Sequence, residues 1–140
     1  CTNINISRVT VDYRKGFNGN IGICVCGYYK TCEASKALDK PRHVRISNCK
    51  VSNCRSPYNQ TAYGIYADGG EDIIIENNEV TNCQGGIEIG AEETNSLTNK
   101  VKVRYNTITK FKVAVVKSKS LPIAAFNIVS DDTALTSLIT

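Results

Sequence analysis

The stretch VRISNCKVSNC at Val44–Cys54 decides the fold, because it recurs along the chain. Residues Ile73–Cys83 read IIIENNEVTNC at an offset of 29 residues (44 to 73), and the Val and Ile positions and the closing Asn-Cys coincide. A third copy, VKVRYNTITKF at Val101–Phe111, follows at an offset of 28 residues (73 to 101), and an earlier one, INISRVTV, spans Ile4–Val11. This spacing is typical of solenoids, in which each repeat is one turn of a coil.

Apolar and polar residues alternate within each copy, which is the period of a β-strand and not of a helix. β-branched Val, Ile and Thr dominate the copies, and Asn and Gly, which tolerate tight corners, interrupt them. A second short apolar alternation follows each copy, at residues 21–25, 64–67, 86–89 and 113–116. The pattern predicts turns of about three short strands and three corners, stacked about 4.8 Å apart.

Stacking places equivalent residues of successive turns in columns, and the apolar columns predict the core. A single turn cannot bury its own apolar face, so the core exists only where turns stack. The predicted inward columns are Val44 with Ile73 and Val101; Ile46 with Ile75 and Val103; Val51 with Val80 and Ile108; and Ile65 with Ile87 and Val113.

The pattern I-x-I-x-N-N-x-V-x-N-C, followed by G-I-x-I, resembles the right-handed parallel β-helix repeat of the pectate-lyase-like superfamily over roughly residues 4–118. The resemblance implies an all-β solenoid of about four to five turns. We expect residues 1–120 to form the turns and residues 121–140 a last partial turn or C-terminal cap. Because terminal turns expose apolar edges, we expect this chain to be a segment of a longer helix or to self-associate through its ends.

Three further columns have an architectural interpretation. Asn side chains at one corner should bond to the backbone of neighbouring turns; they are Asn48, Asn77, Asn78 and Asn106. Cys54 lies over Cys83 and should form an inward or corner stack of small side chains. Glu76 and Arg104, 28 residues apart (76 to 104), should form a surface cross-strand pair of little energetic weight.

Composition excludes several classes of protein. At 140 residues the chain is one domain, and its net charge of +4 comes from dispersed basic residues without a basic–aromatic run, which argues against a nucleic-acid partner. No apolar stretch is long enough to span a membrane. Seven cysteines without a C-x-x-C pair, and the single histidine His43, argue against a zinc site.

The outward face of the G-I-x-I strands carries the candidate chemistry. The isoleucines point inward, so Tyr66, Asp68 and Glu88 point outward. Asp68 and Glu88 lie on adjacent turns two positions out of register, so their carboxyl groups are expected about 5 to 8 Å apart. Such a pair suits glycoside hydrolysis, or a calcium site with Glu92 as a further ligand, or it is simply solvated.

Tyrosines gather on the same strand and on the loops beside it. Aromatic faces stack on sugar rings at low entropic cost, so these tyrosines are candidates for substrate binding. They are Tyr28, Tyr58, Tyr63 and Tyr66. Local packing of loops is the alternative for each of them.

Gly86–Gly90 resembles the E-x-E-type strand of lyases that use this scaffold for alginate and dermatan, and Lys117–Ser120 resembles their S-x-K-S-like segment. The resemblance implies β-elimination on a uronate polymer. Calcium held by Asp68 and Glu88 would offset the uronate charge, and Lys117 would abstract the proton α to the carboxylate, with Lys119 contacting the substrate.

The sequence therefore favours a polysaccharide-active enzyme, a lyase in preference to a hydrolase. The resemblance implies a location outside the cell, at the cell surface or in the periplasm. A non-catalytic surface β-helix, either an adhesin or a carbohydrate-binding stalk, stays open, as does a glycoside hydrolase with paired carboxylates. An enzyme needs the acids to converge with a base or a metal, whereas a stalk needs only its columns.

Overall fold

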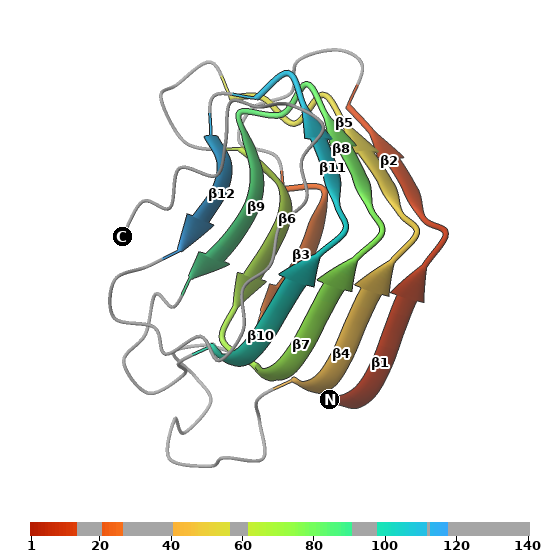
Figure 1. Ribbon diagram of the computed structural model, residues 1–140, viewed down its shortest axis with the longest axis vertical. Coiled ribbons are helices and arrows are strands. Elements are labelled where there is room, and N and C mark those ends of the chain that lie inside the picture. Colours follow the sequence, from red (N-terminus) through yellow and green to blue (C-terminus); the bar gives the residue numbers. More distant parts are fainter. Residues whose placement is uncertain (14–20, 27–40, 57–61, 91–97, 112, 118–140) are drawn as a thin grey trace.

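The computed structural model describes residues 1–13, 21–26, 41–56, 62–90, 98–111 and 113–117. Within these ranges the chain forms twelve β-strands and no helix (Figure 1). The strands are β1 Thr2–Ser7, β2 Thr10–Asp12, β3 Ile23–Cys26, β4 Arg42–Ser47, β5 Lys50–Ser52, β6 Tyr63–Asp68, β7 Glu71–Glu76, β8 Glu79–Thr81, β9 Gly85–Gly90, β10 Asn99–Arg104, β11 Thr107–Thr109 and β12 Val113–Lys117.

Every third strand returns to the same sheet, so the strands form three four-stranded sheets in which all pairs are parallel. Sheet 1 has the order β1-β4-β7-β10, sheet 2 the order β11-β8-β5-β2, and sheet 3 the order β12-β9-β6-β3. Figure 1 shows the three sheets around one interior, with each turn contributing one strand to each sheet. The predicted all-β parallel helix is confirmed. The predicted cap at residues 121–140 lies outside the described residues.

The strand register confirms three of the four predicted apolar columns. Val44 pairs with Ile73 and Ile73 with Val101, and the columns through Ile75 and Val80 pair in the same way. The fourth column is wrong at its last member. Ile65 pairs with Ile87 as expected, but Ile87 then pairs with Val115, while Val113 pairs with Gly85.

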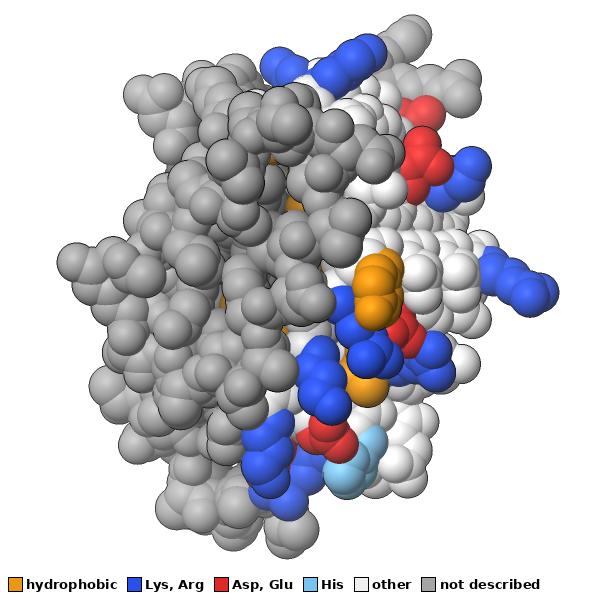
Figure 2. Space-filling view, in the orientation of Figure 1, with side chains coloured by type: hydrophobic (Ala, Val, Ile, Leu, Met, Phe, Trp, Pro, Cys, Tyr) orange, Lys and Arg blue, Asp and Glu red, His pale blue; other side chains and the backbone are white. Residues whose placement is uncertain are grey.

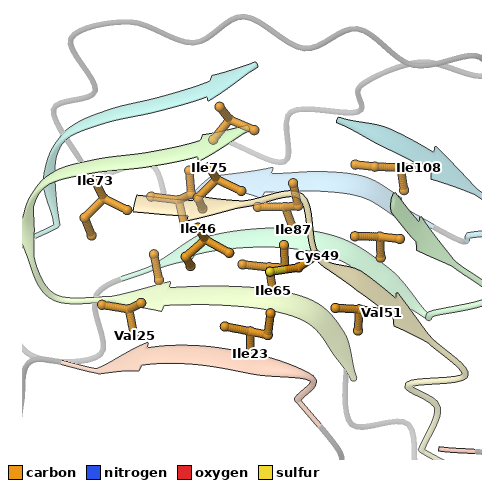
Figure 3. Close-up of a cluster of buried hydrophobic side chains, with 14 of the residues drawn as sticks. Ile23, Val25, Ile46, Cys49, Val51, Ile65, Ile73, Ile75, Ile87 and Ile108 are labelled. Atoms are coloured by element: carbon orange, nitrogen blue, oxygen red, sulfur yellow. The ribbon is translucent and has the colours of Figure 1, made fainter. Parts of the chain in front are cut away.

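The core is a stack of β-branched side chains. Figure 3 shows Ile46, Ile65, Ile73, Ile75 and Ile87 pointing from different sheets into the same interior. Each of these five side chains has no exposed surface. Complete burial of an isoleucine side chain contributes about 1.5 to 3 kcal/mol relative to leaving it exposed, so the stacked columns are the main source of stability.

Left-handed backbone turns the chain at the corners. In sheet 1 the second strand residue has positive φ in every turn, and two further positive-φ columns follow the strands of sheets 1 and 2. These three columns are Asn3, His43, Asp72 and Lys100; Arg8, Asn48, Asn77 and Tyr105; and Asn53, Asn82 and Lys110. Asn is common in them because its short polar side chain tolerates this conformation.

The predicted Asn ladder forms at the corner between sheets 1 and 2, with two of the four predicted members. Asn78 Nδ2 donates to the Ile46 carbonyl (3.0 Å), and Asn106 Nδ2 donates to the Ile75 carbonyl (2.9 Å). The Asn78 N–H donates to Asn106 Oδ1 at 3.0 Å. Asn48 and Asn77 instead occupy the exposed left-handed position just before the ladder.

Cys54 and Cys83 are both buried, as the inward stack predicts. Contact with the Cys83 thiol, together with burial, raises the pKa of the Cys54 thiol well above its usual range. Burial disfavours the charged thiolate, so Cys54 packs as a small apolar side chain and is not a nucleophile.

The predicted pairing of Glu76 with Arg104 is confirmed, but the expectation that Glu76 lies at the surface is wrong. Its carboxylate is only 4% exposed and binds two arginines, Arg104 Nε at 2.6 Å and the Arg45 guanidinium on the opposite side. The Arg104 guanidinium, assisted by that of Arg45, lowers the pKa of Glu76. Arg45, Glu76 and Arg104 lie on three successive turns, so the two ion pairs link neighbouring turns of the helix.

Candidate functional site

The outer face of sheet 3 carries the predicted acids in the predicted register. Tyr66 on β6 pairs with Glu88 on β9, and Asp68 pairs with Gly90. Adjacent strands lie about 4.8 Å apart and residues rise about 3.3 Å, so the Cα atoms of Asp68 and Glu88 are about 8 Å apart. The two acids are thus diagonal neighbours on adjacent turns.

Two tyrosine rings lie on the same face. The ring centroids of Tyr63 and Tyr66 are 6.1 Å apart with an interplanar angle of 31°. A Cβ atom at Gly85 would lie 2.2 Å from the Tyr63 ring, and one at Gly90 would lie 3.0 Å from the Tyr66 hydroxyl oxygen. The glycines at the two ends of β9 therefore make room for the rings of β6.

The rings and the acids differ in exposure. Tyr63 and Tyr66 are each 8% exposed and Asp68 is 7% exposed, whereas Glu88 is half-buried. Asp68 is therefore not a freely solvated carboxylate, and the alternative that this residue is simply solvated is excluded. Tyr66 extends over Gly90, the partner of Asp68 and the second residue after Glu88, so its ring lies next to both acids.

A buried threonine holds the ends of the two strands together. The N–H of Gly69, a residue with φ of 77°, donates to Thr98 Oγ1 at 2.7 Å. Thr98 Oγ1 in turn donates to the Gly90 carbonyl at 2.5 Å. Because Thr98 is fully buried, this bridge fixes the corner that follows Asp68 relative to the end of β9.

The predicted calcium site is incomplete in the part of the chain that the structure describes. That part contains no cluster of three or more His, Cys, Asp or Glu side chains suited to a metal ion. Asp68 and Glu88 supply two carboxylates, whereas calcium takes about six to eight oxygen ligands. The predicted third ligand, Glu92, lies outside the described residues.

The remaining predicted site residues fall in three groups. Lys117 is on β12, the strand next to β9, where it pairs with the buried Ile89 while Val116 pairs with Glu88. Tyr28, Tyr58 and Lys119 lie outside the described residues. Tyr63 and Tyr66 lie on β6, in the cluster with the acids.

Among known protein families, the model described as "Right handed beta helix region" matches residues 32–133 of this chain. The match covers most of the 140 residues and agrees with the three parallel sheets. The chain belongs to the right-handed β-helix family. Neither the curated proteins nor the solved structures yield a match. Because this scaffold supports many activities, membership establishes the fold, and the site residues must carry any argument about chemistry.

A second charged cluster of this right-handed β-helix, on sheet 1, was not predicted from the sequence. His43 Nδ1 is 2.6 Å from Asp72 Oδ2, and Glu71 lies between Lys100 (Nζ–Oε1, 3.2 Å) and Arg42 (Nε–Oε2, 3.7 Å). These residues line a depression of about 280 Å³. Figure 2 shows acidic and basic side chains together on this face, with the histidine among them.

The acidic and basic side chains of this cluster pair with one another. Exposed ion pairs of this kind contribute little to the free energy of folding. The 29-residue offset (43 to 72) already placed His43 and Asp72 in one column, so the repeat held the signal for their contact. The residues that line this depression include no Tyr ring that could stack on a sugar, and both of its carboxylates are paired with basic side chains. The outer face of sheet 3 is therefore the stronger candidate site.

Proposed function

We propose that this right-handed β-helix acts on a polysaccharide at the outer face of sheet 3, and that its reaction is β-elimination on a uronate-containing polymer. The observation that carries the proposal is the register of β6 and β9, which brings Asp68, Glu88 and the Tyr66 ring together on one face. Paired acids beside an aromatic ring are suited to binding and polarising a sugar.

β-Elimination removes the proton α to the uronate carboxylate and breaks the bond to the glycosidic oxygen, leaving a carbon–carbon double bond and a protonated leaving group. The chain must therefore stabilise the developing negative charge and supply a base, and the proton that the base removes can pass to the leaving glycosidic oxygen. In our proposal Asp68 and Glu88 contribute oxygen ligands to calcium, which supplies the charge stabilisation when bound. The proposed base is Lys117, the residue that the resemblance to lyases implies; its backbone pairs with Ile89, one position beyond Val116, the partner of Glu88.

Glycoside hydrolysis is the second candidate, and the unequal exposure of Asp68 and Glu88 favours it. Hydrolases of this kind need one carboxylic acid and one carboxylate with different surroundings. A purely binding role is the third candidate. Uronate-containing polymers are extracellular polysaccharides, so we also propose that the protein acts outside the cell, at the cell surface or in the periplasm.

One set of assays separates the three candidates. The purified protein is incubated with alginate, polygalacturonate, dermatan and neutral β-glucans, each with calcium and with a chelator. Absorbance of the unsaturated product reports elimination, and new reducing ends without that absorbance report hydrolysis. Retention on immobilised polymer without either signal reports binding alone.

Elimination that requires calcium supports the full proposal. New reducing ends without the unsaturated product would show that the reaction is hydrolysis and not elimination. The absence of product and of retention with every polymer would refute a polysaccharide function for sheet 3. Detection of the protein in fractionated cells tests the location separately, and a purely cytoplasmic protein would contradict it.

A further inference from the structure

A second groove lies at the corner between sheets 1 and 2, outside the face that carries Asp68 and Glu88. It encloses about 480 Å³ and runs across three successive turns. Equivalent residues of neighbouring turns lie side by side along the groove, so each turn contributes a similar set of lining residues. The lining residues that matter here are Asn48, Asn77 and Tyr105 on one side and Lys50, Glu79 and Thr107 on the other.

Tyr105 departs from the repeat at this corner. Arg8, Asn48, Asn77 and Tyr105 occupy the same column with φ of 58°, 55°, 55° and 56°, and Tyr105 is the aromatic member of this column. Asn suits the left-handed conformation, whereas a bulky aromatic residue is strained there. Tyr105 is also 56% exposed, although burial is the usual reason for an aromatic side chain. The backbone and the core therefore gain nothing from the ring at this position, which points to a role in binding.

The chemistry of the groove suits a sugar ring. The exposed Tyr105 ring offers a flat apolar surface, and the exposed Asn48 and Asn77 offer amide donors and acceptors. Lys50 Nζ and Glu79 Oε2, 3.6 Å apart, add a charged donor and acceptor to the opposite wall. A sugar presents an apolar C–H face for stacking and hydroxyl groups around its edge, so it matches both kinds of surface.

The charges of the groove favour a neutral sugar. Lys50 is opposed by Glu79, and Arg104, whose guanidinium carbon lies 5.9 Å from the Tyr105 ring centroid, is opposed by Glu76. The charged residues that line the groove are one base and one acid, Lys50 and Glu79, so the lining has no net charge to attract a phosphate backbone, which is what drives nucleic-acid binding. We propose that this groove binds a neutral glycan segment, with one sugar ring stacked on Tyr105.

The inference does not depend on the proposed reaction, because the groove and the outer face of sheet 3 share no residue. Glu88→Gln should leave binding in the groove unchanged, and loss of the groove should leave the chemistry at sheet 3 intact on short substrates. Failure of either proposal can thus be recognised separately.

The test is a titration of the ¹⁵N-labelled chain with hexasaccharides of β-linked glucose, xylose and mannose, followed by amide chemical shifts. A single-stranded DNA dodecamer serves as the competing class of ligand. We expect at least one hexasaccharide to shift the amides of Asn48, Asn77 and Tyr105. Tyr105→Asn should weaken that binding about tenfold or more, and Tyr105→Phe should retain it, because the ring face makes the contact.

Lys110→Asn is the matched control. Lys110 has φ of 54° at the next corner and does not line the groove. Both Asn substitutions should raise the melting temperature or leave it unchanged, since both relieve left-handed strain, but only Tyr105→Asn should lose binding. Shifts caused by the DNA alone, the absence of shifts with all three hexasaccharides, or unchanged binding by Tyr105→Asn would each overturn the inference.

Discussion

Arg104 Nε donates a hydrogen bond of 2.6 Å to Glu76 Oε2, and this pair joins the third turn of the helix to the fourth. The guanidinium of Arg45, on the second turn, binds the other oxygen of the same carboxylate. The side chain of Glu76 is nearly inaccessible, whereas Arg45 and Arg104 are partly exposed. One buried acid therefore links three successive turns.

We expect Glu76→Gln to lower the free energy of unfolding by about 1 to 3 kcal/mol, because it leaves two guanidinium groups without their charged partner. Urea unfolding measures the change. Glu79→Gln is the matched control, since the Glu79 side chain is 55% exposed and its pair with Lys50 should be worth less than about 1 kcal/mol. Equal effects of the two substitutions would mean that the Glu76 pair is no stronger than a surface contact.

The contribution of Glu76 should depend on pH. Its folded-state pKa is lowered by Arg104 and Arg45, so its stabilisation is present above the unfolded-state pKa, about 4.3, and is lost as the pH falls through the folded-state pKa. The stability difference between the wild type and Glu76→Gln should be constant from about pH 7 to 5 and shrink at lower pH. A difference that stays constant under acid conditions would exclude an ionised Glu76 as its source.

Gly85→Ala should displace the Tyr63 ring, because the added Cβ would lie 2.2 Å from it, and should destabilise the protein by about 1 to 3 kcal/mol. A double-mutant cycle with Tyr63→Ala tests the cause. In the Tyr63→Ala background the cost of Gly85→Ala should fall by more than about half, since the obstructing ring is gone. Additive effects would show that the alanine strains the backbone instead.

Glu88→Gln should abolish activity on the polymer identified in the assays above and change the melting temperature little, because Glu88 is half-buried and lies outside the apolar core. If calcium takes part, calorimetry should show weaker calcium binding by this variant than by the wild type. Asp72→Asn is the control here, since Asp72 lies on sheet 1 and does not line the groove at Tyr105. Full activity of Glu88→Gln would remove Glu88 from the proposed chemistry and favour a binding role.

The repeat alone determined which residues face the core. Residues 44, 73 and 101 align because alternation at period two, together with offsets of 29 (44 to 73) and 28 (73 to 101) residues, fixes how the strands of sheet 1 stack. A slip by one residue would move every apolar side chain to the outside, so burial itself forbids it.

The last strand of sheet 3 shows where this argument ends. The sequence predicted Val113 beside Ile87, whereas Val115 is the partner. A slip by two residues keeps every side chain on the same face, so the alternating pattern cannot detect it. Only the path of the chain through the preceding corner decides between the two registers.

Burial of polar groups was likewise decided by the tertiary structure. The sequence predicted an outward direction for Asp68 and Tyr66 and a pairing of Glu76 with Arg104, and both follow from alternation and the repeat offset. It did not predict that Asp68, Tyr66 and Glu76 are nearly inaccessible to solvent. Direction is a property of one strand, but exposure depends on what neighbouring turns place over a side chain, and only the assembled coil determines that.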